Sequence, residues 1–120
     1  MSDHMTAKVL RRAAEIVDQG WCQVSFHRGD KHCLVGALLR AGQEIHGTYD
    51  NVHIHPAVEY VALAIGHRTP MCWNDERGRT ADEVADALRR AADHADSGES
   101  LGARSATDSG SPEAGGEERR

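Results

Sequence analysis

The chain has 120 residues, 39% of them hydrophobic, which suits one ordinary domain with a core of small side chains. Its net charge is −5, and residues 1–94 are nearly balanced in charge with no basic stripe, which argues against nucleic acid as a partner. No apolar run is long enough to cross a membrane and no signal peptide precedes the first helix, so we expect a cytoplasmic protein whose three cysteines are reduced thiols.

A first helix is predicted over residues 6–20, because apolar side chains recur there at helical spacing. Thr6 is a typical N-cap and Gly20 a typical stop signal. In residues 21–32, polar and apolar side chains alternate, which predicts a short strand or an extended connection. The pair Gly29-Asp30 predicts a turn near the end of this segment.

A second, very apolar helix is predicted over residues 33–42, with Gly42 as its C-terminal stop. Gly36 lies inside this helix, where glycine costs about 1 kcal/mol relative to alanine. A helix usually accepts that cost for close packing against another backbone or a ligand. Residues 43–55 are polar and predict a loop, with at most a short extended piece at 52–54.

A third helix is predicted from Pro56 to Gly66, because proline suits the first turn of a helix and glycine ends one. A last helix is predicted over residues 80–95. Thr80 and Glu83 have the spacing of a capping box, in which each side chain accepts a hydrogen bond from the backbone N–H of the other residue.

Residues 95–120 form an acidic segment rich in Gly and Ser, with one Leu and no aromatic residue. Such a segment cannot bury enough apolar surface to offset the entropy of ordering its backbone, so we predict a disordered tail. The fold class predicted from the whole pattern is mainly α. It is a compact four-helix single domain over residues 1–94, with irregular or short extended connections between its helices.

Three motifs occur in a fixed order: a Gly20-Trp21 turn, a C-x-x-GAL helix that starts at Cys33, and a WND-x-x-GRT helix start at Trp73. In this combination the chain resembles a family of small actinobacterial and phage-borne helical domains of unassigned function. The resemblance covers about residues 6–94. It implies a small, mainly helical single domain, and it implies no activity.

Cys33 is the first candidate for chemistry. At the head of a helix, the helix dipole and the free N–H groups lower the pKa of a thiol and favour the thiolate. His32 and Lys31 precede it, and Asn74 or Asp75 would be able to orient a histidine base in a Cys–His–Asn/Asp arrangement. The alternative is that Cys33 is a small buried hydrophobic residue.

The eight histidines raise the question of a metal site. On an extended segment, His53 and His55 would lie on one face, and with His46 or Cys72 they would offer imidazole and thiolate ligands to zinc. The spacing matches no established metal motif, however, and an ordinary loop explains it equally well. We therefore assign no metal and no other cofactor.

The stretch from Pro70 to Val84 fits two interpretations. In the structural one, Asp75 pairs with Arg79, Trp73 packs its ring on the core, and Asn74 bonds to its own backbone in a turn. In the functional one, these side chains face a pocket beside Cys33, where the arginine holds an anion and the aspartate handles a proton. The catalytic residues would be Cys33, His32 and Asp75, and the ligand-binding residues Trp21, Trp73, Asn74 and Arg79.

Two functions follow from these alternatives. The first is a small, cofactor-independent enzyme that acts on a small molecule through a Cys/His/Asp-Asn pocket. The alternative is a non-catalytic binding or regulatory module that uses the turn from Trp73 to Arg79. A small-molecule ligand or substrate is the expected partner, nucleic acid and membranes are not, and the Ala-rich helix faces are compatible with a homodimer.

Overall fold

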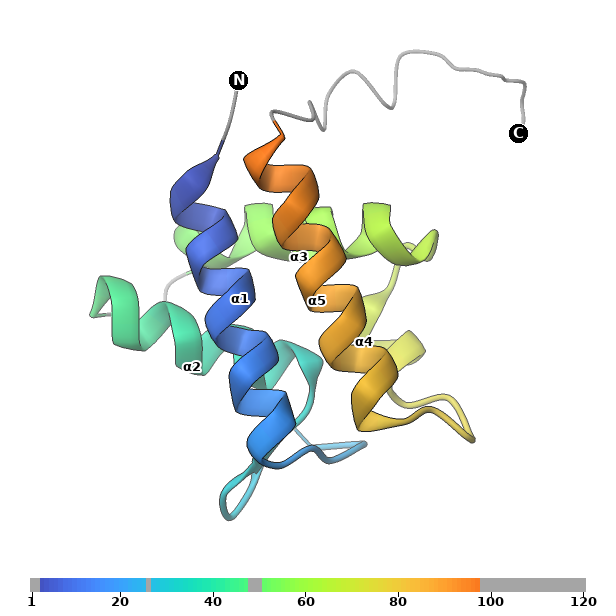
Figure 1. Cartoon of the computed structure of the whole chain (residues 1–120). Helices are drawn as coiled ribbons and strands as arrows, with labels where there is room; N and C mark the ends of the chain where they lie inside the picture. Colours follow the sequence, from blue (N-terminus) through green and yellow to red (C-terminus); the bar gives the residue numbers. More distant parts are fainter. Residues whose placement is uncertain (1–2, 26, 48–50, 98–120) are drawn as a thin grey trace, which may run out of the picture.

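The computed structural model describes residues 3–25, 27–47 and 51–97, and it contains four long helices in that part of the chain (Figure 1). They are α1 (His4–Gln19), α2 (Leu34–His46), α3 (Asn51–Ile65) and α5 (Ala81–Asp96). A five-residue helix, α4 (Pro70–Asn74), and two strands, β1 (His27–Arg28) and β2 (Lys31–His32), complete the described elements. The mainly α fold is confirmed, and α4 is the helix that the four-helix prediction lacked.

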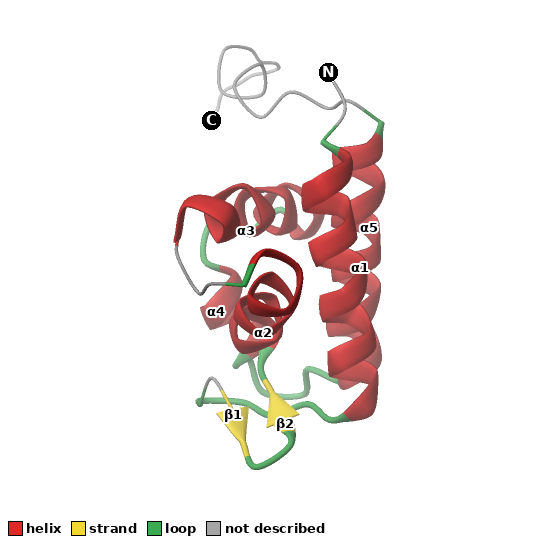
Figure 2. Ribbon diagram, turned by 90° about the vertical axis from the view of Figure 1, so that its left-hand side faces the viewer, coloured by secondary structure: helices red, strands yellow, loops and turns green. Residues whose placement is uncertain are grey.

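Helices α1 and α5 lie side by side in opposite directions and form one layer, against which α2 and α3 pack (Figures 1 and 2). The start of α1 and the end of α5 are tied together, since the Asp3 N–H donates to the Ala95 carbonyl at 2.8 Å. The strands lie at the other end of this layer (Figure 2). Helix α5 includes the first two residues of the predicted tail, and the rest of that prediction, from residue 98 on, lies outside the described residues.

The core lies between the two layers and is built almost entirely from Ala, Val and Leu, as the composition predicts. Four leucines and four valines are its largest fully buried apolar side chains: Leu10, Leu34, Leu38, Leu88, Val9, Val17, Val61 and Val84. Alanines let the helices approach closely, and all those of α1 and all those of α5 except Ala81 are fully or almost fully buried. No helix in the described ranges is long and apolar enough to span a bilayer.

The ends of α1 and α5 follow local rules. The cap of α1 is Asp3, whose carboxylate accepts from the Thr6 N–H at 3.1 Å and the Thr6 hydroxyl at 2.6 Å, so Thr6 as the cap was wrong. Gly20 ends the helix as predicted. The predicted capping box of α5 is confirmed: the Glu83 N–H donates to Thr80 Oγ1 at 3.2 Å, and the Thr80 N–H donates to Glu83 Oε1 at 3.0 Å.

Gly42 does not end α2, which continues to His46 and stops at Gly47 in the left-handed conformation. A Cβ atom on Gly42 would lie 2.5 Å from Ile54 Cδ1, so glycine leaves the space that the end of the Ile54 side chain occupies. Burial of Ile54 against α2 also explains why residues 51–55 are helical instead of the predicted loop or extended piece. Pro56 consequently lies in the interior of α3 and not in its first turn.

The connection between α1 and α2 is a small hairpin. Its two strands pair antiparallel with His27 opposite His32 and Arg28 opposite Lys31, around the predicted turn at Gly29-Asp30. Of the two predicted alternatives, a short strand or an extended connection, a strand forms only at 27–28 and 31–32. Residues 22–25 form no strand and bend at 23–25, and Phe26 lies outside the described residues. β2 is also tied back to the end of α1, because the His32 N–H donates to the Gly20 carbonyl at 3.0 Å.

Candidate functional site

Asn74 is the centre of a hydrogen-bond network that joins three distant segments. It is the last residue of α4 and its side chain is fully buried. Its Oδ1 accepts from Trp21 Nε1 at 2.7 Å and from the Leu34 N–H at 3.1 Å, and its Nδ2 donates to the Cys22 carbonyl at 3.3 Å. The predicted bond to its own turn is replaced by bonds across 40 to 53 residues of sequence.

Asp75 extends this network to the loop that follows Trp21. Its Oδ1 accepts from Asn74 Nδ2 at 2.9 Å and from the Val24 N–H at 2.8 Å. Gln23 supports the same loop, since its Nε2 donates to the carbonyls of Asn74 at 3.0 Å and Glu76 at 2.9 Å. Asp75 therefore holds a backbone segment in place.

The predicted ion pair between Asp75 and Arg79 is wrong. Arg79 pairs with Glu76 at 2.6 Å and with Glu83 at 3.6 Å, while Asp75 is engaged with the loop. The Arg79 guanidinium lies 4.0 Å from the centroid of the Trp73 ring, and Arg79 Nε donates to the Trp73 carbonyl at 3.0 Å. Trp73 packs on the core as predicted, so these two residues fasten the turn to the start of α5.

Cys33 is the N-cap of α2, and its side chain is only 2% exposed. Its Sγ accepts from the Gly36 N–H at 3.3 Å, which satisfies one of the free donors of the first helical turn. Burial raises the pKa of the Cys33 thiol above its ordinary value, and the backbone N–H groups of Gly36 and Val35 offset this only in part. The expectation that the helix start lowers this pKa was wrong, because desolvation outweighs the hydrogen bonds from the backbone N–H groups.

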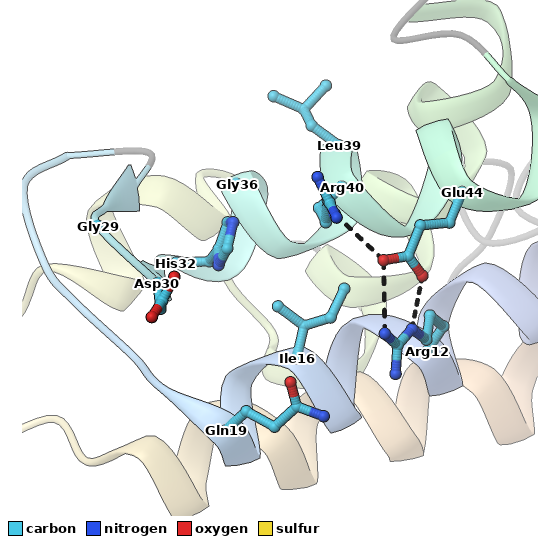
Figure 3. Close-up of a pocket in the computed structure, with 10 residues that line it drawn as sticks. All are labelled: Arg12, Ile16, Gln19, Gly29, Asp30, His32, Gly36, Leu39, Arg40 and Glu44. Atoms are coloured by element: carbon cyan, nitrogen blue, oxygen red, sulfur yellow. Dashed lines mark hydrogen bonds and ion pairs between the residues drawn. The ribbon is translucent and has the colours of Figure 1, made fainter.

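A cleft of about 750 Å³ lies between α1, the hairpin and α2 (Figure 3). Ile16 and Leu39 are its apolar contributions, and Gly36 adds bare backbone. Its polar lining comes from α1, the hairpin and α2: Arg12, Gln19, Asp30, His32, Arg40 and Glu44. This volume is in the range of small-molecule sites, but the lining is more polar than is usual for them, with two apolar side chains against six polar ones.

At one end of the cleft, the Glu44 carboxylate lies between two arginines (Figure 3). Arg12 Nε donates to Glu44 Oε1 at 2.6 Å, and Arg40 Nε donates to Glu44 Oε2 at 3.1 Å. Both interactions lower the pKa of the Glu44 carboxyl, that with Arg12 the more strongly, and Glu44 together with Glu15 raises the pKa of the Arg12 guanidinium. Glu15 also pairs with Arg12, at 3.1 Å, so the two arginines and the two glutamates of this cluster have no net formal charge.

The seven predicted site residues fall into three places. Trp21, Asn74 and Asp75 meet in the buried network, Trp73 and Arg79 pair on the turn before α5, and His32 lines the cleft. Cys33 adjoins the network through the backbone of Leu34, and it is absent from the cleft lining. Of these residues, the structure brings only His32 to the cleft.

Sequence reasoning missed the arginines of the cleft. The pairing of Arg12 with Glu44 spans 32 residues, which no local pattern reveals. The spacing of Arg40 and Glu44 on one helix was the available signal, because residues four apart on a helix are neighbours.

The described residues contain no group of three or more His, Cys, Asp or Glu side chains placed to hold a metal ion. Within the proposed histidine pair, His55 lies within 3.0 Å of Glu59 on α3 and its side chain is largely exposed. The side chain of His53 lies outside the described residues.

Fold and site together define a small, mainly helical protein in which a buried Asn-centred network anchors a hairpin beside a polar cleft. A family model described as "Family of unknown function (DUF6197)" matches residues 1–94, and the chain belongs to that family. The match covers the three motifs recognised in the sequence. The comparisons with curated proteins and with solved structures gave no significant match.

Proposed function

We propose that this protein is a non-catalytic binding module that holds a small anionic molecule in the cleft between α1, α2 and the hairpin. The observation that carries this proposal is the Arg12–Glu44–Arg40 triad at one end of a cleft of about 750 Å³. Arg12 is paired with both Glu15 and Glu44, whereas Arg40 is paired with Glu44 alone, so Arg40 is the cation placed to bind a ligand anion.

Arg40 is the group we expect to contact the anion. Its described interaction uses only Nε, toward Glu44, and its side chain is 52% exposed at the cleft. The two terminal nitrogens of the guanidinium match the two oxygens of a carboxylate or phosphate. Arg12 instead bonds to both Glu44 and Glu15, so its role is to fix Glu44 between the two helices.

The other end of the cleft favours a ligand with a hydrogen-bond donor or a positive charge. Asp30 and His32 of the hairpin lie there, with Gln19 of α1 nearby (Figure 3). Ile16 and Leu39 offer apolar contact along the wall. The ligand we propose is thus a small molecule with an anionic group at one end, a donor group at the other, and an apolar middle.

The burial and raised pKa of the Cys33 thiol support binding in preference to catalysis through this residue. The catalytic proposal keeps His32, which is the predicted acid–base residue at the cleft. We further propose a cytoplasmic location and an actinobacterial or phage origin for the domain. Its ligand would be a small molecule, with neither nucleic acid nor membrane as a partner. We also propose a homodimer, which sedimentation would test.

The experiment is a titration of the ¹⁵N-labelled chain with three sets of probes: α-amino acids, dicarboxylates and nucleoside monophosphates. We expect a binder from these sets to shift the backbone signals of Gly29, Gly36 and Leu39. Arg40→Gln should weaken its binding about tenfold or more. Arg90→Gln is the matched control, because Arg90 is also about half exposed and is paired four residues away on its helix.

Two results would contradict the proposal. One is a set of shifts that map away from the cleft, and the other is unchanged affinity in the Arg40→Gln variant. Turnover of a bound probe that is lost in His32→Gln would instead favour the catalytic proposal.

A further inference from the structure

Val24 has a backbone conformation that β-branched residues rarely adopt. Its φ is 75°, in the left-handed region, and it is the sole non-glycine residue of the described ranges with a positive φ. Burial of the side chain does not compensate for this strain, because the residue is 78% exposed. A strained conformation persists only where the surrounding structure holds it, and such positions gather at functional surfaces.

The structure that holds Val24 is the Asn74 network. Asp75 fixes the Val24 N–H, and the buried Asn74 in turn fixes the Asp75 carboxylate. Gln23 ties the preceding residue of the loop to two carbonyls after α4. These bonds hold the Val24 side chain in solvent. Without them, we expect Val24 to return to a negative φ.

Val24 borders an open depression of about 410 Å³. Its lining consists of the loop after α1 and the hairpin: Trp21, Cys22, Gln23, Val24, Arg28 and Lys31. No carboxylate belongs to this lining. The depression therefore combines an aromatic edge, an exposed valine and two cations.

Arg28 and Lys31 lie directly opposite each other in the hairpin, and both are exposed. Like charges in this cross-strand position repel each other and destabilise a hairpin. In the part of the chain that the structure describes, neither side chain forms an ion pair. An anionic partner that contacts both cations would relieve this repulsion.

We propose that this depression is a docking site for an acidic peptide segment of a partner protein. Carboxylates of the segment contact Arg28 and Lys31, and an apolar side chain between them packs on Val24 and the edge of Trp21. A small inorganic anion would make no use of the exposed valine. Nucleic acid is disfavoured, because two cations on a chain of net charge −5 do not form a basic track.

The test uses the full-length ¹⁵N-labelled chain and fluorescein-labelled peptides of the pattern Glu-Glu-X-Glu-Glu, in which X is Leu, Phe or Trp. We expect these peptides to shift the Val24 amide and the Trp21 indole signals, and the peptides with Lys in place of Glu not to do so. The double variant Arg28→Glu/Lys31→Glu should weaken binding of the acidic peptides about tenfold or more.

The matched control is Lys8→Glu/Arg68→Glu, which changes the net charge equally at two exposed residues outside the depression. It should leave binding of the peptides within about twofold of the wild type. If the charge reversal in the hairpin unfolds the chain, the double variant Arg28→Gln/Lys31→Gln removes both cations without adding repulsion and is expected to lose the same binding.

Val24→Gly separates the apolar contact from the charges. Glycine accepts a positive φ, so the variant should unfold at a temperature no lower than the wild type while it binds the acidic peptides more weakly. Equal affinity for acidic and basic peptides, or unchanged affinity in the hairpin or Val24 variants, would overturn the proposal. If the same signals shifted with protein concentration in the absence of peptide, the site would be assigned to a second copy of the chain. That result would also overturn the proposal.

Discussion

Replacement of Asn74 by alanine should be one of the most destabilising single substitutions in this chain. It leaves the Trp21 indole N–H, the Leu34 N–H and the Cys22 carbonyl without their partner. A buried polar group that loses its only partner costs about 1–3 kcal/mol. Trp21 and Cys22 border the open depression, where water can replace part of the loss, so we expect a total of about 3–5 kcal/mol.

The assay is urea unfolding, followed by far-UV circular dichroism and by the fluorescence of the two tryptophans. Gln23→Ala is the control, because it removes two hydrogen bonds of the same network at a partly exposed side chain. Water can replace both bonds there, so this variant should cost only about 0.5–1.5 kcal/mol. Coincident transitions by the two probes would show that the wild type unfolds in two states.

The reasoning would be refuted if the free energies of unfolding of Asn74→Ala and Gln23→Ala differed by less than about 1 kcal/mol. Buried and exposed hydrogen bonds would then contribute equally to stability. A cost of 3–5 kcal/mol is a large part of the roughly 5–15 kcal/mol that stabilises a typical domain. Asn74→Ala is therefore expected to show a lower midpoint of unfolding at unchanged slope, as long as the native state persists.

Three further predictions follow from the packing and the charges. In the native chain, a thiol reagent at neutral pH should label the exposed Cys72 rapidly and Cys33 only as fast as the fold opens, and rapid labelling of Cys33 would contradict its burial and raised pKa. Gly42→Ala should gain about 1 kcal/mol of helix propensity but lose about 1–3 kcal/mol to the clash with Ile54, and Ile54→Val should rescue it in a double-mutant cycle measured by calorimetry. Because two arginines lower the pKa of Glu44 in the folded state, its stabilising effect is present at neutral pH and lost as the pH falls through the carboxyl range. Glu44→Gln should thus cost less than about 1 kcal/mol at neutral pH and flatten the acid side of the stability profile, whereas an unchanged profile would show that the triad is fully screened.

The elements that sequence predicted well are those set by neighbours in the chain. The capping box of α5, the stop of α1 at Gly20 and the turn at Gly29-Asp30 each depend on residues within one helical turn or hairpin. Gly42 misled the prediction, because a glycine that ends a helix and a glycine that admits a neighbouring helix look alike in sequence. The start of α3 was hidden for the same reason, since Ile54 reveals its burial only against α2.

The candidate site was less predictable than the fold. The preference of asparagine for turns predicted a hydrogen bond between the Asn74 side chain and its own backbone. In the structure, Leu34 and Trp21, which bond to this side chain, lie 40 and 53 residues away. The sign of the pKa shift at Cys33 depends on how deeply α2 is buried, which the position of a residue in a helix does not determine. The cleft was not visible at all, because it exists only where α1, α2 and the hairpin meet.

The structural and functional interpretations of the Trp73-Asn74-Asp75 motif are connected. Asn74 anchors Trp21 and the start of α2, and the hairpin between those two anchor points carries Asp30 and His32 into the cleft. A residue that only fastens the chain therefore also determines the shape of the proposed binding site. The two contributions can be separated by experiment. Loss of Asn74 should lower stability and ligand affinity together, whereas loss of Arg40 should lower affinity alone.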